Sequence, residues 1–324
     1  MRLNEYKKIV VYIYSMNTKN ILKYRTLKDS TIKLYERKGK KIAEFLGISD
    51  LVPKIIKQRE NDLVAFFDTQ GSHEKKLLLN ICLLVLSPQK FNPKKGYKKL
   101  YNRLNKNLWN THDKYLLERY SGVKNTRERN NWCEWEEVEN RLEKLKNDYE
   151  ITKDKKELKK YFALALYVLH PPRRLEYSQM KIIKQSAYKK LKVALRRQGV
   201  YLVIKKDGYN FSFGRDMVKV KKRFDVAHII EVEPMLGDII SLWLEKNKTE
   251  YLFPIRNGEK AMDVNQFSQL LKKTFEPKKI SSNMLRKIFL SEWNSVQRSM
   301  NEREEMALLM NHSALVALGI YTKI

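Results

Sequence analysis

The chain has 324 residues, enough for about two domains of ordinary size. It carries 66 Lys and Arg against 37 Asp and Glu, a formal net charge of +29. This excess favours a polyanionic partner, most often nucleic acid, although a lysine-rich composition also keeps a protein soluble without any partner.

Cysteine content and hydropathy exclude several classes of protein. Cys82 and Cys133 lack the CxxC spacing of a zinc or redox site, and two cysteines in a chain this long are typical of a reducing compartment. The first residues show no secretory signal. The longest apolar run, residues 77–86, is shorter than the ~20 residues of a membrane span, so we expect a buried helix there and no membrane association.

The first part of the chain is predicted to be helical. Residues 1–27 form a basic extension without clear periodicity, and residues 28–120 form a helical domain. Helices are expected within 30–48, 62–70, 77–86 and 96–110. In the first of these, three lysines lie between the apolar positions and are candidate DNA contacts: Lys38, Lys40 and Lys41.

Residues 121–131 are polar and charged, which is typical of a linker. A second domain, residues 132–324, is predicted to follow. Asn131 can cap its first helix, in which Trp135, Val138 and Leu142 have helical spacing. The next helix ends at Pro171-Pro172.

The middle of the second domain has the period of strands. Residues 199–204 and 209–214 flank Asp207-Gly208, a hairpin signal, and residues 228–234 form a third candidate strand. Helical patterns resume from residue 235 to the end. The fold class predicted is mainly α with a small antiparallel β-sheet.

Two of four unusual polar segments in this domain are rich in basic residues. In the first, Arg173 and Arg174 follow the two prolines, and Glu176 is spaced to hold Arg173; an ordinary salt bridge at a helix start is the plainer interpretation. The second connects two strands and is either a solvated turn or a DNA-facing loop. Its basic residues are Lys219, Lys221, Lys222 and Arg223.

The other two segments lie near the end of the chain. In residues 280–296, Asn283 and Arg286 lie within one helical turn and off the apolar face, so they are either two exposed polar residues or one ligand-binding pair. In residues 310–321, His312 lies nine residues before Tyr321. That histidine can simply begin a helix, and that tyrosine can simply pack.

Together the four segments resemble the catalytic domain of tyrosine recombinases, the family of phage and mobile-element integrases. The family pattern runs Arg, Lys in a β-hairpin, His-x-x-Arg, His or Trp, then Tyr. Arg173 with Glu176 matches its RxxE, Asn283 to Arg286 matches its HxxR with Asn for His, and the segment Met310-Asn311-His312-Ser313 resembles its LGHS. Tyr321 has the family's spacing of nine residues. The style of residues 171–182 also resembles integrases of large DNA viruses and their parasites.

The resemblance covers residues 131–324 and implies a mechanism without metal, cofactor or ATP. Tyr321 would form a 3′-phosphotyrosyl link. Arg173 and Arg286 would bind the phosphate oxygens, with Asn283 and His312 adding hydrogen bonds and Lys219 protonating the leaving 5′-oxygen. Residues 28–120 would be the core-binding domain, and the partner would be double-stranded DNA, with two sites paired by a homotetramer. Such a protein acts in a prokaryotic cytoplasm, or in the nucleus or viral factory of a host cell.

The sequence departs from the family in three ways. Asn283 cannot carry a proton, the 46-residue interval from Arg173 to Lys219 is long, and three residues follow Tyr321 where many relatives have a longer subunit-gripping tail. Lys221, Lys222, Lys205 and Lys206 are therefore rival candidates for the general acid. A type IB topoisomerase and a non-catalytic DNA-binding protein stay as alternatives, and a metal-dependent integrase is disfavoured because no acidic constellation accompanies the basic segments.

Overall fold

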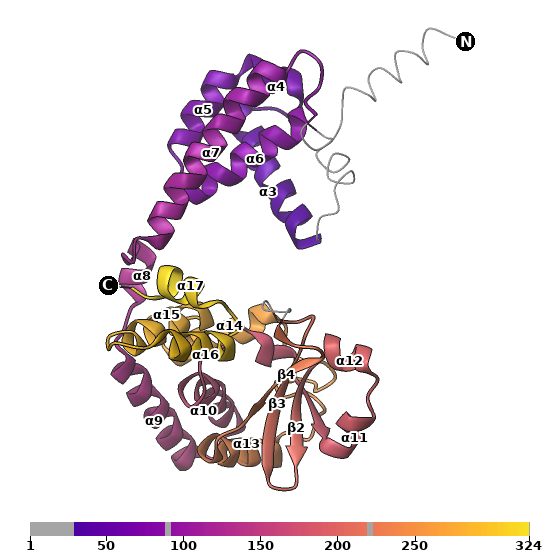
Figure 1. The fold of residues 1–324 in the computed structure, drawn as a ribbon, viewed down its shortest axis with the longest axis vertical. Helices are drawn as coiled ribbons and strands as arrows, with labels where there is room; N and C mark the ends of the chain where they lie inside the picture. Colours follow the sequence, from indigo (N-terminus) through magenta and orange to yellow (C-terminus); the bar gives the residue numbers. More distant parts are fainter. Residues whose placement is uncertain (1–28, 88–91, 219–222, 324) are drawn as a thin grey trace, which may run out of the picture. The chain divides into compact units, whose positions relative to one another are not determined.

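The computed structural model describes residues 29–87, 92–218 and 223–323. The chain divides into two compact units, Met1–Tyr120 and Ser121–Ile324, called unit 1 and unit 2 below (Figure 1). The basic extension predicted at residues 1–27 lies outside the described residues. The predicted fold class, mainly α with a small sheet, is confirmed, but the sheet is mixed rather than antiparallel.

Unit 1 is built around helix α6 (Ser72–Leu86), which contains the apolar run expected to be a buried helix. Leu78, Leu79, Ile81 and Cys82 are each fully buried, because other helices cover this helix on several sides. Across the described residues, no helix combines the length and apolar character needed to cross a membrane. The surrounding helices are α3 (Asp29–Leu46), α4 (Pro53–Gln58), α5 (Glu60–Asp68) and α7 (Lys98–Tyr120).

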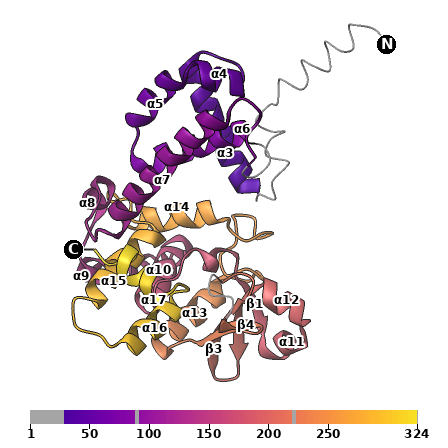
Figure 2. The same ribbon diagram turned by 45° about the horizontal axis from the view of Figure 1, so that its top comes forward.

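Helix α10 (Lys155–Val168) lies at the centre of the helical core of unit 2, and its residues from Tyr161 to Tyr167 are all buried. Its neighbours in contact are α9 (Trp135–Thr152), α13 (Pro234–Lys246) and α14 (Val264–Thr274). The C-terminal helices lie together on one side of the unit and the sheet on the other (Figures 1 and 2). These helices are α15 (Ser282–Trp293), α16 (Met300–Leu309), α17 (Ala314–Val316) and a π-helical turn, Ala317–Tyr321.

The segment predicted as a linker is partly helical. Residues Thr126–Asn131 form α8, which begins with a capping box between Asn125 and Glu128. The Glu128 carboxylate accepts a hydrogen bond from Lys287 on α15, and this buried ion pair ties α8 to unit 2. Only residues 121–125 therefore lack helical structure between α7 and α8.

The cap predicted for α9 was wrong. Glu134 is the N-cap residue, and it forms a capping box with Glu137. The Asn131 side chain instead donates to the Arg127 carbonyl and accepts from the Lys279 amide. Sequence spacing did not reveal this, because Lys279 is 148 residues away.

The sheet has the order β1-β2-β3-β4. The three predicted strands are confirmed as β2 (Val200–Lys205), β3 (Gly208–Gly214) and β4 (Ala227–Glu231), paired antiparallel. Gly208 has φ 114°, the conformation for which glycine was expected in this turn. The sequence did not reveal β1 (Lys181–Lys184), which pairs parallel with β2 through two intervening helices, α11 (Gln185–Lys190) and α12 (Val193–Gln198).

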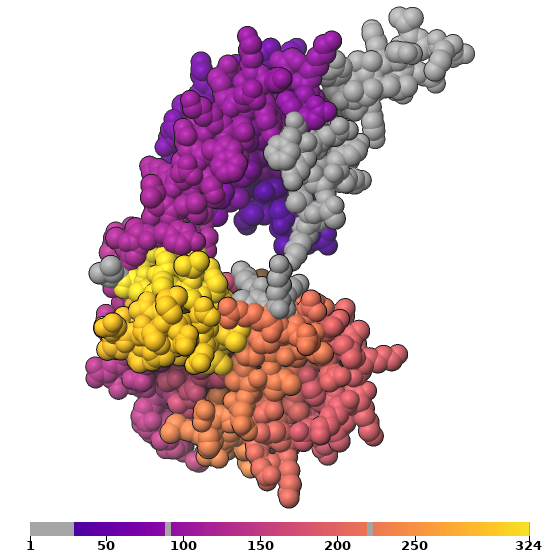
Figure 3. Space-filling model, in the orientation of Figure 1, coloured from indigo at the N-terminus to yellow at the C-terminus, as the bar shows by residue number. Residues whose placement is uncertain are grey.

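Sheet and helices meet in one core, which places the polar segments of unit 2. Phe211 and Phe213 of β3 pack edge-on against Tyr177, which belongs to a short 3₁₀ helix, Glu176–Gln179. The arginine segment just before this 3₁₀ helix is therefore fixed against β3. On the surface, the C-terminal residues and the sheet region form neighbouring parts of unit 2 (Figure 3).

Candidate active site

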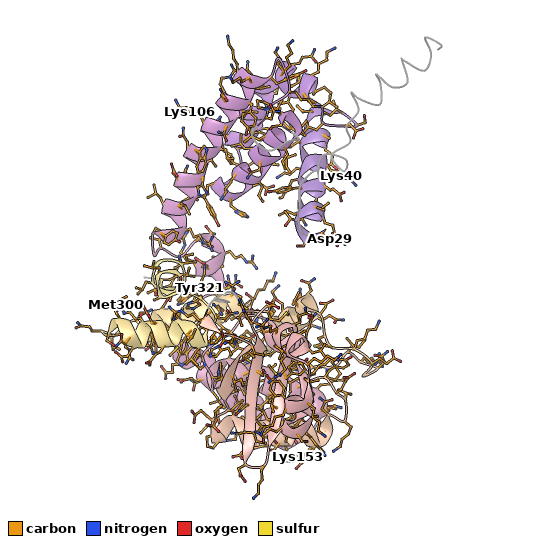
Figure 4. The ribbon with its side chains drawn as sticks, turned by 45° about the vertical axis from the view of Figure 1, so that its right-hand side comes forward. Asp29, Lys40, Lys106, Lys153, Met300 and Tyr321 are labelled. Atoms are coloured by element: carbon orange, nitrogen blue, oxygen red, sulfur yellow. The ribbon has the colours of Figure 1, made fainter. Side chains whose placement is uncertain are left out.

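Tyr321 ends the π-helical turn and packs against α15 in an apolar cluster with Leu290, Met310, Ala317 and Ile320. Its side chain is 4% exposed. Figure 4 shows it at the end of unit 2 opposite to Lys153. Single π-helical turns are rare and often lie at functional sites, because they shift the direction of the following side chain.

The two residues after Tyr321 are hydrogen-bonded to the end of α15. Thr322 accepts a hydrogen bond of 2.8 Å from Asn294, and the Lys323 amide donates one of 2.8 Å to Ser291. Ser291 lies in the last turn of α15, and Asn294 is the C-cap residue of that helix. These contacts hold Tyr321 beside Arg286 of α15.

Two guanidinium groups approach the Tyr321 ring and oxygen. Arg174 Nη2 donates to Tyr321 Oη at 3.3 Å, and the guanidinium carbon of Arg286 lies 4.7 Å from the ring centroid. Burial raises the pKa of Tyr321, but the charges of Arg286 and Arg174 outweigh that effect and hold the pKa below its usual value. Tyr321 therefore ionises more readily than an ordinary tyrosine, and the tyrosinate is the nucleophilic form.

Arg173 is fully buried, with its guanidinium carbon 3.7 Å from the Phe213 ring centroid. Its Nη1 donates to the Leu309 carbonyl. Arg286, also fully buried, donates from Nη1 to the carbonyls of Pro172 at 3.1 Å and Met310 at 2.8 Å. The two arginines thus fix the end of α16, from which the chain leads into His312.

His312 stacks on Tyr321, with 5.3 Å between ring centroids and 18° between ring planes. Burial, followed by the charge of Arg286, lowers the pKa of His312 to about 3, so the ring is neutral at pH 7. Nδ1 lies 3.1 Å from the Ser313 carbonyl, and this contact assigns the ring proton to Nδ1. The buried Nε2 then keeps a lone pair, and it has no hydrogen-bond partner in the described part of the chain.

Several buried guanidinium nitrogens also lack a partner. Within the described residues, no acceptor lies in reach of Nε and Nη2 of Arg173, Nε and Nη2 of Arg286, or Nε of Arg174. A buried donor without an acceptor costs about 1–3 kcal/mol, and more when it is charged. The cluster is therefore arranged for an anion with several oxygen atoms.

Glu176 does not hold Arg173 as predicted. Its Oε1 accepts from Asn311 Nδ2 at 2.8 Å, and its Oε2 is buried without a partner among the described residues. The prediction assumed helical spacing, but the 3₁₀ helix begins at Glu176, so Arg173 lies before it. Glu176 instead fixes Asn311, whose φ of 60° turns the chain into His312.

Asn283 and Arg286 do not share an exposed face. Asn283 is exposed and lines a surface hollow with Asn125, Lys279 and Lys287. Arg286 is buried because the C-terminal segment covers that side of α15, which the periodicity of one helix does not show.

Of the basic residues between β3 and β4, Lys219, Lys221 and Lys222 lie outside the described residues. Arg223 is exposed and lies 3.8 Å from the Glu304 carboxylate. The rivals Lys205 and Lys206 stand at the β2–β3 turn, about five residues or ~17 Å along β3 from Phe213. They are therefore far from Arg173.

The lysines predicted to bind DNA in unit 1 differ in environment. Lys38 and Lys41 both bind Glu74, and Lys41 also donates to Gln70 at 2.9 Å. Lys40 is exposed. The ion pairs make Lys38 and Lys41 part of the packing between α3 and α6.

Three residues near the cluster were not singled out from the sequence. Arg174 is one, because the RxxE pattern selected its neighbour. His170 and His228 are the others: each is buried, and burial, followed by the charge of Arg173, lowers the pKa of each to about 4. His228 faces Phe213 across the β3–β4 ladder, a position that only the strand register reveals.

Within residues 29–87, 92–218 and 223–323, no group of three or more His, Cys, Asp and Glu is gathered as a metal site would be. No family model and no curated protein matches this sequence. Among solved structures, the crystal structure of XerA recombinase is similar over 95% of this chain and 92% of that one, with 13% identity and a TM-score of 0.37. We therefore argue function from the side chains around Tyr321.

Proposed function

We propose that this chain cleaves and rejoins DNA through a covalent link to Tyr321, in the manner of a tyrosine recombinase. The observation that carries the proposal is the group of buried, unpartnered guanidinium nitrogens of Arg173, Arg174 and Arg286 around the Tyr321–His312 pair. A phosphodiester supplies the oxygen acceptors that these donors lack. The net charge of +29 favours DNA as its source.

The reaction follows from the residue types. Tyr321 Oη attacks phosphorus, its bond to phosphorus forms, and the bond to the 5′-oxygen breaks. The phenol proton is released to water rather than held by His312, whose pKa is about 3, while the arginines offset the charge on the non-bridging oxygens. The leaving oxygen takes a proton from a lysine, for which we propose Lys219.

The energy of the phosphodiester is kept in the phosphotyrosyl link, so a second DNA end can reverse the step without ATP. We propose a 3′-phosphotyrosyl link and a tetramer on two DNA sites, on the resemblance of the sequence motifs. Asn283, exposed on α15 three residues before Arg286, would donate its amide to the DNA backbone.

The described state of the site is closed. Tyr321 is 4% exposed, and Arg173 and Arg286 are fully buried. A phosphate therefore reaches Oη only after the turn Ala317–Tyr321 or its neighbours shift. We propose that DNA binding produces this shift.

The test is a suicide substrate, a nicked duplex whose cleaved fragment diffuses away and traps the covalent complex. Tyr321→Phe should give no protein–DNA adduct, because the ring has no oxygen to bond phosphorus, while DNA affinity stays close to that of the unaltered chain. Tyr120→Phe, at an exposed tyrosine of unit 1, is the matched control and should form adduct normally. An adduct that persists in Tyr321→Phe would overturn the assignment of the nucleophile.

A plasmid assay separates the two enzymatic interpretations. Strand exchange between two sites supports a recombinase. Relaxation of supercoils without strand exchange would instead assign the same Tyr321 chemistry to a topoisomerase-like enzyme.

A further inference from the structure

The two helices between β1 and β2 form a strongly basic surface. Residues 184–197 contain six Lys and Arg and no Asp or Glu. None of the six forms an ion pair within the described residues, whereas Lys181 and Lys205, just outside, pair with Glu250 and Glu231. Four of the six are exposed lysines, which we call the basic crossover: Lys184, Lys189, Lys190 and Lys192.

The crossover is rigidly attached to the sheet. Tyr188 packs with Tyr201 and Val203 in a separate small apolar cluster, and its hydroxyl lies 2.7 Å from Ser212 Oγ of β3. Tyr201 donates to the Leu195 carbonyl at 3.2 Å. Because both ends are held, the exposed lysines project from a fixed backbone. The entropy lost when they bind a ligand is therefore smaller.

The segment that carries the basic crossover continues to Arg197, which lies close to the strand that contacts Arg173. The carbonyl of Arg197 lies so close to Gly214 that a Cβ there would stand 2.4 Å from it. Gly214 directly follows Phe213, on whose ring Arg173 lies. Arg197 further accepts from the Asp216 amide at 2.9 Å and donates to the Asp225 carbonyl at 3.0 Å, at the two ends of the connection from β3 to β4.

Figures 1 and 2 both show α11 and α12 beside the sheet, on the side away from α9 and α15. Helix α11 contacts β1 and β2, and α12 contacts β3. The segment that carries the four exposed lysines thus reaches the arginine cluster through Arg197 and Gly214, which follows Phe213. A duplex whose phosphate lay at Tyr321 would continue past the cluster, and its backbone carries a charge about every 1.7 Å of helix axis.

We propose that the basic crossover is an accessory DNA site, which binds backbone phosphates of the duplex flanking the cleaved position. This inference rests on the proposed function for its geometry, since Tyr321 defines the cleaved position. Lysines with free ammonium groups contact phosphates without reading sequence, so the crossover would add affinity and salt dependence rather than specificity.

The test uses full-length protein carrying Tyr321→Phe, so that binding is measured without cleavage. Lys184, Lys189, Lys190 and Lys192 are replaced together by Gln. The matched control replaces four exposed lysines of α9, its C-cap and the start of α10 by Gln: Lys144, Lys153, Lys155 and Lys156. Figure 4 shows Lys153 at the end of unit 2 opposite to Tyr321.

Duplex affinity is then measured from low to high salt. We expect the crossover variant to lose about 0.9 in the log–log salt slope for each phosphate contact removed, and so up to ~4, while the control variant keeps the slope. An unchanged thermal midpoint shows that the variant is folded, as expected for exposed lysines. Equal slopes in crossover variant, control variant and parent would overturn the proposal.

A second readout keeps this proposal separate from the proposed function. In protein with Tyr321 intact, the crossover variant should still form covalent adduct at low salt, and should need higher protein concentration at high salt. The crossover variant could lose salt dependence of DNA affinity while neither it nor its parent forms a covalent adduct. That result would support the DNA site and contradict the catalytic proposal. Full adduct formation by the crossover variant at every salt concentration would count against the DNA site.

Discussion

If Tyr321 is the nucleophile, as proposed, Arg174→Gln should change how cleavage depends on pH, because Arg174 donates a hydrogen bond to Tyr321 Oη. The guanidinium donates to Tyr321 Oη at 3.3 Å, and its charge helps hold the pKa of Tyr321 below the usual value. Glutamine keeps a hydrogen-bond donor but removes the charge. The pKa of Tyr321 should therefore rise in the variant.

The size of the effect follows from the contact distance. Two unit charges 3.3 Å apart interact by about 5 kcal/mol at an effective dielectric constant of ~20. Arg174 is only half-buried, so solvent and the neighbouring Arg286 reduce this value, and an opposite charge in contact usually shifts a pKa by about 1–3 units. At neutral pH the tyrosinate fraction, and with it the cleavage rate, should fall roughly 10- to 1,000-fold.

The assay is single-turnover cleavage of the suicide substrate from acidic to strongly alkaline pH. Below the pKa of Tyr321 the rate rises with pH, so the variant should lag most at low pH and approach the parent as pH rises. Arg174→Lys, which keeps the charge, should recover part of the loss. Lys153→Gln removes an equal charge from an exposed site at the end of unit 2 opposite to Tyr321, and should leave the profile unchanged. A loss in Arg174→Gln that is the same at every pH would refute the reasoning, because it would place Arg174 outside the ionisation of the nucleophile.

Three further outcomes are expected. Covalent adduct formation should survive excess EDTA, since arginines rather than a metal offset the charge; activity restored only by added magnesium would contradict this. Glu128→Gln should lower the free energy of unfolding by about 1–3 kcal/mol in urea titrations, because it leaves the half-buried Lys287 ammonium without its charged partner, and a change under ~0.5 kcal/mol would show the pair to be dispensable. His170 and His228 keep pKa values of about 4 when folded but near 6.5 when unfolded, so the unfolded state binds protons first as pH falls. Stability should drop from about pH 6.5 to about pH 4, by up to ~3 kcal/mol for each histidine, and glutamine at either position should flatten that curve in denaturant titrations.

Much of the fold could be predicted because its signals are local. The Asp207-Gly208 turn needs one residue with positive φ, and Gly208 supplies it at 114°. The apolar run 77–86 is buried as expected. Strand β1 was missed because only four residues pair, and what makes them a strand is β2, almost twenty residues later.

The site was harder to predict, because its residues are arranged by contacts between distant segments. Spacing of three residues suggested that Glu176 holds Arg173, yet that rule applies only inside a helix, and Arg173 lies before one. Periodicity placed Arg286 on an exposed face, whereas the C-terminal segment buries it. Arg174 was passed over because its neighbour fits the RxxE pattern, and only the folded chain shows which arginine meets Tyr321.

The cluster is also unfavourable to the free protein, and this bears on what it is for. Arg173 and Arg286 are fully buried, burial lowers the pKa of both, and each repels the other. Glu176 is the nearby carboxylate that partly offsets them, and its hydrogen bond goes to Asn311 instead. Backbone carbonyls satisfy one nitrogen of each arginine and leave two without acceptors in the described structure.

A fold that served stability alone would be better with apolar side chains at these positions. Strain of this kind persists where a ligand relieves it, and a phosphodiester carries both the negative charge and the oxygen atoms that these donors lack. On the proposed function, the same binding energy would open the turn that covers Tyr321, and DNA binding would thereby expose the proposed nucleophile.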